Sequence, residues 1–359
     1  DDRPGVTSLT SIENRLRWTE SNTSGSWYIN RNNKGVKISA TTTITVYYEI
    51  SAIYNMELLA LKGKNALGKS FFVPFQNTYP VTGNYNYRYR PYSSFVIVAT
   101  EDNTQIRINP TQNIFVFPSD QLPANTPFTI WLSKGQTSII APYQYHEYPA
   151  GTASIHRTHN SNKLSGTSVD VLSGGNIAII TCDDMVTQGG GVDFVGDQIV
   201  PTTLIGTEYA VIRGALADNK EHVYVVGTEN ATRIWVNGVE SLPAINSRGT
   251  RPIPIPSGQI ITRIETDKPA YVYHLSGFDN GAQNQTAGAI IPTISVCTGS
   301  TKVSFNRTKA NYDNGYGNKY YDFYMNILVR KGAENSFVLY DKNGNDVTNV
   351  VLPGLNLPG

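Results

Sequence analysis

The chain has 359 residues, a net charge of +1 at pH 7, and charged side chains at only 16% of its positions. A near-neutral chain offers no electrostatic field for nucleic acid or for an anionic membrane, so we exclude both as partners. No apolar run approaches the roughly 20 residues that a membrane-spanning helix needs, so direct membrane insertion is excluded as well.

The local patterns predict an all-β protein. Tyrosine (22 residues) and glycine (31 residues) are abundant, and amphipathic helical periodicity is hard to find. Short alternating runs such as Thr43–Glu49 and Thr104–Asn109 are typical of half-buried strands. Gly, Pro, Asn and Asp interrupt these runs at close spacing, as turns do.

Residues 1–29 form an amino-terminal extension, and residues 30–127 form the first of three predicted β units. This unit contains an aromatic and basic segment at 84–92, in which Tyr85, Tyr87 and Tyr89 alternate with polar residues. In an extended chain these rings share one face, which suits recognition of a protein or stacking on a sugar. The alternative is a strand whose tyrosines cover the edge of the domain. The candidate ligand-binding residues here are Tyr85, Tyr87, Arg88, Tyr89, Arg90 and Tyr92.

The second unit, 128–252, carries an insertion at 142–163 that is rich in histidine. Imidazoles and a carboxylate on one loop could ligate zinc or copper. A polar, solvated loop is the alternative, and we favour it. The candidate ligands are His146, Glu147, His156 and His159.

The third unit, 253–350, is followed by a linker-like end at 351–359. Its tyrosines occupy the same place in the unit as the segment at 84–92 does in the first, and the candidates are Tyr312, Tyr316, Tyr320 and Tyr321. Asp341, Asn343 and Asn345 place oxygen atoms at alternate positions, as a calcium loop does. The same sequence is an ordinary hairpin turn, which is the favoured interpretation. Apart from calcium, we expect no cofactor.

Internal repetition supports the three units. Val98–Asn109 aligns without gaps to Val226–Asn237 at an offset of 128, and both are interpreted as hairpins. Val329–Tyr340 is a fainter third copy. Repeats of this kind usually pack on their neighbours, so we expect three tandem sandwich-like repeats with approximate three-fold internal symmetry.

Three stretches resemble the amino-terminal domain family of IgGFc-binding protein, in its branch from large surface proteins of gliding, Bacteroidetes-type bacteria. They are Leu164–Val169 with Asn176–Ile180, Cys182–Gln188 with Gly196 and Val200-Pro201, and Ile290–Phe305 with Met325–Gly332. Asp184 stands where the family has His, and Gly189 where it has Pro. The resemblance implies secretion, a modular surface architecture and a binding role.

Two cysteines, Cys182 and Cys297, are too few for a disulfide scaffold or a four-ligand zinc site. They could form one bridge between units two and three in an oxidising compartment, or remain two separate buried thiols.

The sequence lacks the common nucleophile, metalloprotease and phosphate-binding signatures. We therefore expect no enzyme but a secreted or cell-surface adhesion and recognition module, part of a larger chain, that binds an extracellular protein or glycan. One alternative is a carbohydrate-active enzyme or its binding accessory, using adjacent carboxylates such as Asp183 and Asp184. The other is a structural subunit of an extracellular assembly.

Overall fold

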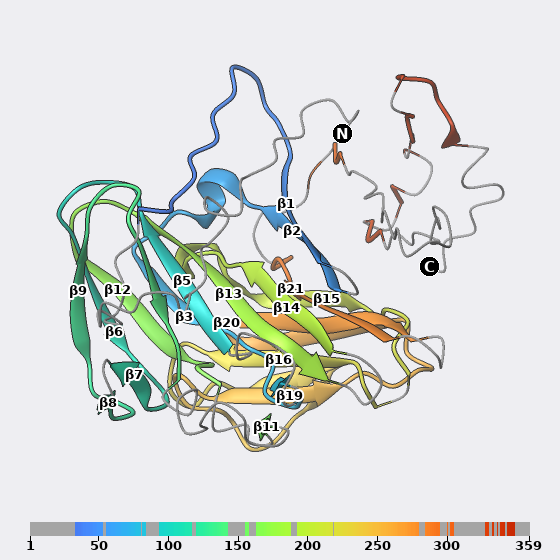
Figure 1. Cartoon of the computed structure of the whole chain (residues 1–359). Helices are drawn as coiled ribbons and strands as arrows, with labels where there is room; N and C mark the ends of the chain where they lie inside the picture. The colour runs from blue at the N-terminus through green and yellow to red at the C-terminus, as the bar shows by residue number, and fades with distance from the viewer. Residues whose placement is uncertain are drawn as a thin grey trace. The chain divides into compact units, whose positions relative to one another are not determined.

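The computed structural model is all-β, as the sequence predicts (Figure 1). The structure describes residues 33–52, 55–79, 81–83, 93–116, 120–142, 155–157, 163–187, 192–217, 219–279, 284–294, 300, 302–304, 327–329, 332–333, 336, 338–341 and 343–348. The chain divides into two compact units, Asp1–Phe305 and Asn306–Gly359. Among the described residues, no helix has the length and apolar character to cross a bilayer.

In the first unit, a first set of strands forms two sheets. The larger follows the order β10-β5-β13-β4-β11 with β14 beside β13, and the smaller follows β3-β12-β6-β9. Their bounds are β3 Ser70–Val73, β4 Val81–Gly83, β5 Ser93–Ala99, β6 Thr104–Asn109, β9 Phe128–Leu132, β10 Thr137–Ile140, β11 Ile155–Arg157, β12 Thr167–Ser173, β13 Ile177–Thr187 and β14 Val192–Gln198.

A second set of strands forms one sheet of order β18-β17-β20-β16-β19, with β15 and β21 also paired to β20. The bounds are β15 Gly206–Ile212, β16 His222–Gly227, β17 Ile234–Val236, β18 Val239–Glu240, β19 Thr250–Pro254, β20 Ile261–Asp279 and β21 Asn284–Ile290. The described residues of the unit also include two antiparallel strand pairs, β1 Val46–Ala52 with β2 Asn55–Leu61 and β7 Ile114–Val116 with β8 Asp120–Leu122. They include short 3-10 helices at Gly63–Ala66 and Thr202–Leu204 as well.

The two strand sets share one hydrophobic core. All six residues of β16 are buried, because each face of this strand packs in a different hydrophobic cluster. Tyr224 and Val226 join the core of the first strand set, together with Tyr271 and Tyr273 of β20. The opposite face of the same sheet contributes to a second, separate cluster around Val225. The alternation of side chains along a strand thus makes one strand serve two cores.

The strand pairing repeats between the two sets at the predicted offset. β5 pairs with β10 and β13, and β16 pairs in the same way with β19 and the second half of β20. β6 pairs with β12 as β17 pairs with the first half of β20. The equivalent positions are Val98 and Val226, whose partners are Thr137 and Ala178 in one set and Thr250 and Tyr271 in the other. The equivalence of the two aligned segments is confirmed.

The interpretation of these segments as hairpins is wrong. β5 and β6 lie in different sheets, and β17 pairs with β18 and β20 rather than with β16. The polar turns that follow β5 and β16 therefore do not return the chain along the preceding strand, as a hairpin turn would. β9 and β10 follow residue 127 yet pair with β6 and β5, so strand pairing crosses the expected first boundary. Val329–Tyr340 lies partly outside the described residues, and three-fold symmetry stays a prediction.

Candidate functional site

One end of the larger sheet pairs two short strands that adjoin or lie within the predicted binding segments. β4 leads directly into the tyrosine-rich segment at 84–92, and β11 lies within the histidine-rich insertion. The two strands pair antiparallel, with Thr82 opposite His156, and β4 also contacts β13 at Val186. Two strands far apart in the sequence thus lie side by side, and we call this part of the sheet the β4–β11 end.

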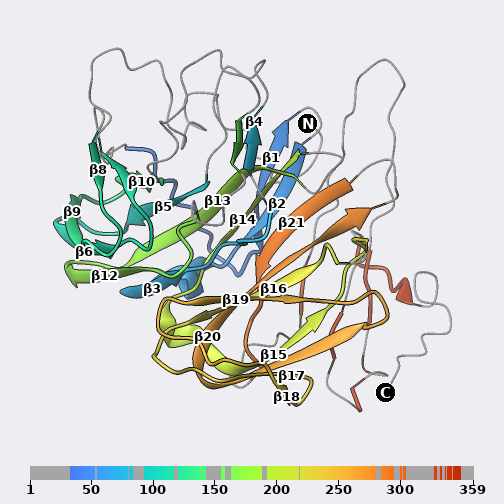
Figure 2. The same ribbon diagram turned by 90° about the horizontal axis from the view of Figure 1, so that it is seen from below.

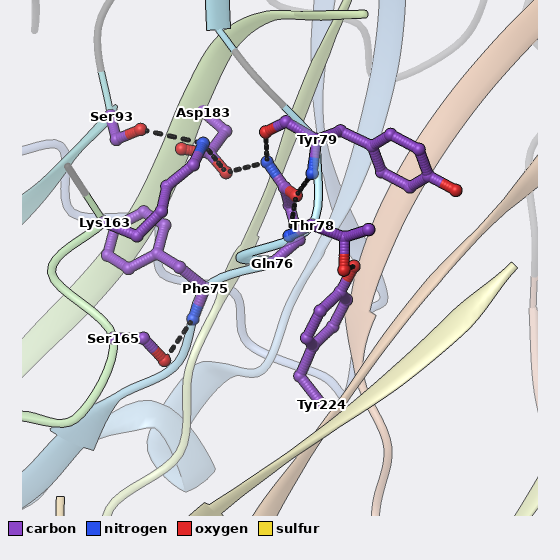
Figure 3. Close-up of polar contacts among 9 residues, drawn as sticks. All are labelled: Phe75, Gln76, Thr78, Tyr79, Ser93, Lys163, Ser165, Asp183 and Tyr224. Carbon is purple, nitrogen blue, oxygen red and sulfur yellow. Dashed lines mark hydrogen bonds and ion pairs between the residues drawn. The ribbon is translucent and has the colours of Figure 1, made fainter. Parts of the chain in front are cut away.

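A buried polar network lies where these segments begin and end (Figure 3). Lys163 Nζ forms an ion pair with Asp183 Oδ2 at 3.0 Å, and both side chains are almost fully buried. Lys163 Nζ also donates to Ser93 Oγ at 3.1 Å, and Gln76 Nε2 donates to the same oxygen of Asp183 at 3.0 Å. We call these four residues the anchor network.

The position of each member explains what the network holds. Ser93 is the first residue of β5, directly after the tyrosine-rich segment, and Lys163 is the last residue of the insertion. Asp183 lies on the central strand β13, and Gln76 precedes β4. The buried charges therefore tie the ends of both segments to the middle of the sheet. Among the described atoms, Asp183 Oδ1 has no hydrogen-bond partner.

Tyrosines connect the same region to the second strand set. Tyr224 Oη donates to Thr78 Oγ1 at 2.8 Å (Figure 3). Tyr79 Oη donates to the carbonyl of Lys220 at 2.7 Å. His222 contacts the ring of Tyr79 edge to face, with 5.8 Å between the ring centroids. Burial raises the pKa of Tyr79 to about 12, so this phenol remains a neutral donor at physiological pH.

A carboxylate junction joins β14 to β21. Asp193 Oδ2 accepts the backbone N–H of Thr286 at 2.9 Å, and Asp197 Oδ2 accepts that of Ile290 at 2.8 Å. Both acceptors lie four residues apart on β14 and therefore share a face. Asp197 also forms an ion pair with Lys62 at 2.6 Å. At these two positions, carboxylate oxygens of β14 accept the backbone N–H groups of β21 that carbonyl oxygens accept in a paired sheet.

Because of the buried carboxylates at this junction, we expect the chain to be more stable toward unfolding in mild acid than at neutral pH. Burial raises the pKa of Asp193 from 3.8 to about 6. Burial, followed by the charges of Asp197 and Asp193, raises the pKa of Glu57 well above its usual value. A raised pKa means that each carboxyl group binds its proton more tightly in the folded state than in the unfolded state. The free energy of unfolding should therefore rise as the pH falls from about 7 toward about 5. Denaturant titrations at the two pH values measure this change.

Asp193→Asn should reduce the pH dependence, since an amide still accepts the bond from Thr286 but does not titrate. Glu229→Gln is the control, because Glu229 is exposed. Burial lowers the pKa of His222, which acts in the opposite direction. A stability that falls steadily from pH 7 to pH 5 would show that the carboxylates are not the dominant groups.

The structure describes only some of the candidate residues that the sequence predicts. Outside the described residues lie Tyr85, Tyr87, Arg88, Tyr89, Arg90, Tyr92, Tyr312, Tyr316, Tyr320, Tyr321, His146, Glu147, His159 and Cys297. His156 is placed on β11, and Cys182 lies on β13 opposite Gly196 of β14. The disulfide therefore stays a prediction.

The candidate calcium loop has the hydrogen bonds of a turn. Asp341 Oδ1 accepts the backbone N–H groups of Asn343 and Asn345, each at 2.8 Å. Asp341 Oδ2 accepts the side-chain amide of Asn345 at 2.9 Å, and the bonds from Asn345 lower the pKa of Asp341. Both carboxylate oxygens already serve the turn, and calcium binding stays untested. Among the described residues there is no group of three or more His, Cys, Asp or Glu that could hold a metal.

Most residues of the anchor network and of the junction carry no signal of their role in the local sequence. Asp183 stands out there only beside Asp184, as a candidate carboxylate pair. Asp183 instead pairs with Lys163, which the sequence places merely at the end of a polar insertion. The sequence does hold a signal for the junction. Asp193, Val195 and Asp197 occupy every second position of β14 and therefore share one face of the strand.

Comparison with known proteins gives one match. The family model described as IgGFc binding protein matches residues 58–353, which is most of the chain. No curated protein and no solved structure matches. The matched range contains the anchor network, the junction and both strand sets.

Proposed function

Because this chain belongs to the IgGFc-binding protein family, we propose that it is a secreted or cell-surface, non-catalytic recognition module whose ligand is an extracellular protein. The family match over most of the chain is the observation that carries this proposal. The family's name refers to the Fc region of IgG, which is therefore the first ligand to test. An adhesion role and an origin in the bacterial branch belong to the same proposal, and it requires no cofactor.

The β4–β11 end is the proposed place of binding. The anchor network holds the ends of two segments that are rich in tyrosine, arginine and histidine, and such side chains dominate protein recognition surfaces. The shared core and the tyrosine contacts to the second strand set supply a rigid support. A rigid support limits the entropy that binding costs.

Biolayer interferometry against immobilised Fc and a panel of extracellular glycoproteins tests the proposal. The paired substitution Tyr87→Ala and Arg88→Ala should weaken binding at least about tenfold. It should leave the melting temperature nearly unchanged, since we expect both side chains to be exposed, and exposed positions shift stability by less than about 0.5 kcal/mol each.

Tyr340→Ala is the matched control, because Tyr340 is an exposed tyrosine in the second compact unit. Binding that the paired substitution leaves intact would place the ligand elsewhere on the chain. A large loss of stability would mean that these tyrosines belong to the core of the domain.

A further inference from the structure

The outer face of the smaller sheet is polar and carries one open aromatic ring. Along β6 and β9 the side chains alternate strictly, with Ile106, Ile108, Ile130 and Leu132 buried toward the core. The strands of this sheet lie together on the left of Figure 2. Its outward residues, which we call the Trp131 face, are Ser70, Gln105, Arg107, Thr129, Trp131, Ser168 and Asp170.

The register arranges these side chains in rows across the strands. Trp131 lies opposite Gln105, and the next row places Arg107 between Thr129 and Asp170. Two residues along a strand separate rows by roughly 7 Å. Arg107 Nη2 and Asp170 Oδ2 form an ion pair at 3.2 Å, and Ser70 Oγ donates to Asp170 Oδ1 at 2.9 Å. The charges of this row cancel, while donors and acceptors remain at the surface.

Trp131 is exposed to 46%. Within the described part of the chain, its side chain has no hydrogen bond, ring contact or cation contact. Leu172 of β12, at 47% exposure, adds a second apolar side chain at the end of the same strands. Large exposed apolar groups that lie near one another on a soluble protein frequently mark a binding site.

The second strand set shows that the fold does not require this arrangement. Its equivalent face carries Trp235, but the guanidinium of Arg233 covers that ring at 4.8 Å from the centroid. Arg233 is held in turn by Glu240, with Nε at 2.6 Å from Oε1. The same face also carries a charged cluster in which Arg263 forms ion pairs with Glu208 and Glu265. Equivalent strands thus tolerate a covered tryptophan and a charged surface.

We propose that the Trp131 face binds a neutral oligosaccharide of at least two pyranose units. The electron-rich face of an indole attracts the C–H groups on one side of a sugar ring. Sugar hydroxyls both donate and accept, which matches the amide of Gln105 beside the ring and the Arg107–Asp170 pair one row away. Because the pair is already neutralised, the face favours an uncharged glycan over an acidic one. This site uses no residue of the anchor network.

Isothermal titration calorimetry tests the proposal with hexasaccharides of glucose, mannose and N-acetylglucosamine, and with a heparin hexasaccharide as the acidic probe. At least one neutral probe should bind, and Trp131→Ala should weaken that binding at least about tenfold. Trp131→Phe should retain part of it, and Asp170→Asn should reduce it without removing it. Trp235→Ala is the matched control and should bind normally, because its ring is already covered.

Circular dichroism and the melting temperature establish that each variant is folded. The proposal is overturned if no neutral probe binds at about 10 mM, a concentration about tenfold above a dissociation constant of 1 mM. It is also overturned if only the heparin probe binds, or if Trp131→Ala and Trp235→Ala change binding equally. Binding of Fc or another protein tests the β4–β11 end separately, so failure of one site leaves the other standing.

Discussion

Lys163→Met should lower the free energy of unfolding by about 3–5 kcal/mol, because it leaves the carboxylate of Asp183 buried without its cation. Asp183 lies on the central strand β13, and its side chain is only 2% exposed. Gln76 still donates one hydrogen bond, but a neutral amide does not replace an ammonium group. Guanidinium unfolding followed by circular dichroism measures the loss.

Arg107→Met is the matched control, since it breaks an ion pair of similar length at the surface. The Arg107 side chain is 50% exposed, and exposed pairs contribute at most about 1 kcal/mol. The double variant Lys163→Met with Asp183→Leu should recover part of the stability, because both buried charges are then absent. Equal losses for Lys163→Met and Arg107→Met would mean that water reaches the anchor network.

The anchor network also shows why local sequence pattern could not locate the site. The alternating runs and turn residues predict strands, and the offset of 128 predicts equivalent positions, because both signals are local. The partner of each strand is not a local property: β6 pairs with β12, whose residues lie about 60 positions later. A polar turn such as Glu101–Asn103 suits a hairpin and a crossing between sheets equally well. The hairpin interpretation is wrong for this reason.

The same reasoning applies to the charged residues. A lysine at the end of a polar insertion is expected at the surface, since lysine is almost never fully buried without a partner. The partner Asp183 becomes apparent only after the chain has passed through β12 of the smaller sheet and entered β13 of the larger one. By contrast, the family resemblance singled out Leu164–Val169, which contains a glycine that the geometry requires.

Gly166→Ala should destabilise the chain by about 2–5 kcal/mol, for two reasons that add. Gly166 has φ +79°, and a left-handed conformation costs an alanine about 1–2 kcal/mol. An added Cβ would lie 1.9 Å from the carbonyl oxygen of Arg248, and the displacement costs about 1–3 kcal/mol more. Arg248 lies between β18 and β19 of the second strand set, so the strain falls on the contact between the two sets.

Gly135→Ala separates the two contributions. Gly135 has φ +75°, but its added Cβ would meet nothing within 4 Å, so only the conformational cost of about 1–2 kcal/mol should appear. Arg248→Ala should not rescue Gly166→Ala, because the clash is with the backbone of Arg248 rather than with its side chain. Thermal unfolding of the three single variants and of the double variant measures each contribution. If Gly166→Ala costs no more than Gly135→Ala, the loop at Arg248 yields freely and the close approach of the two strand sets there does not stabilise the fold.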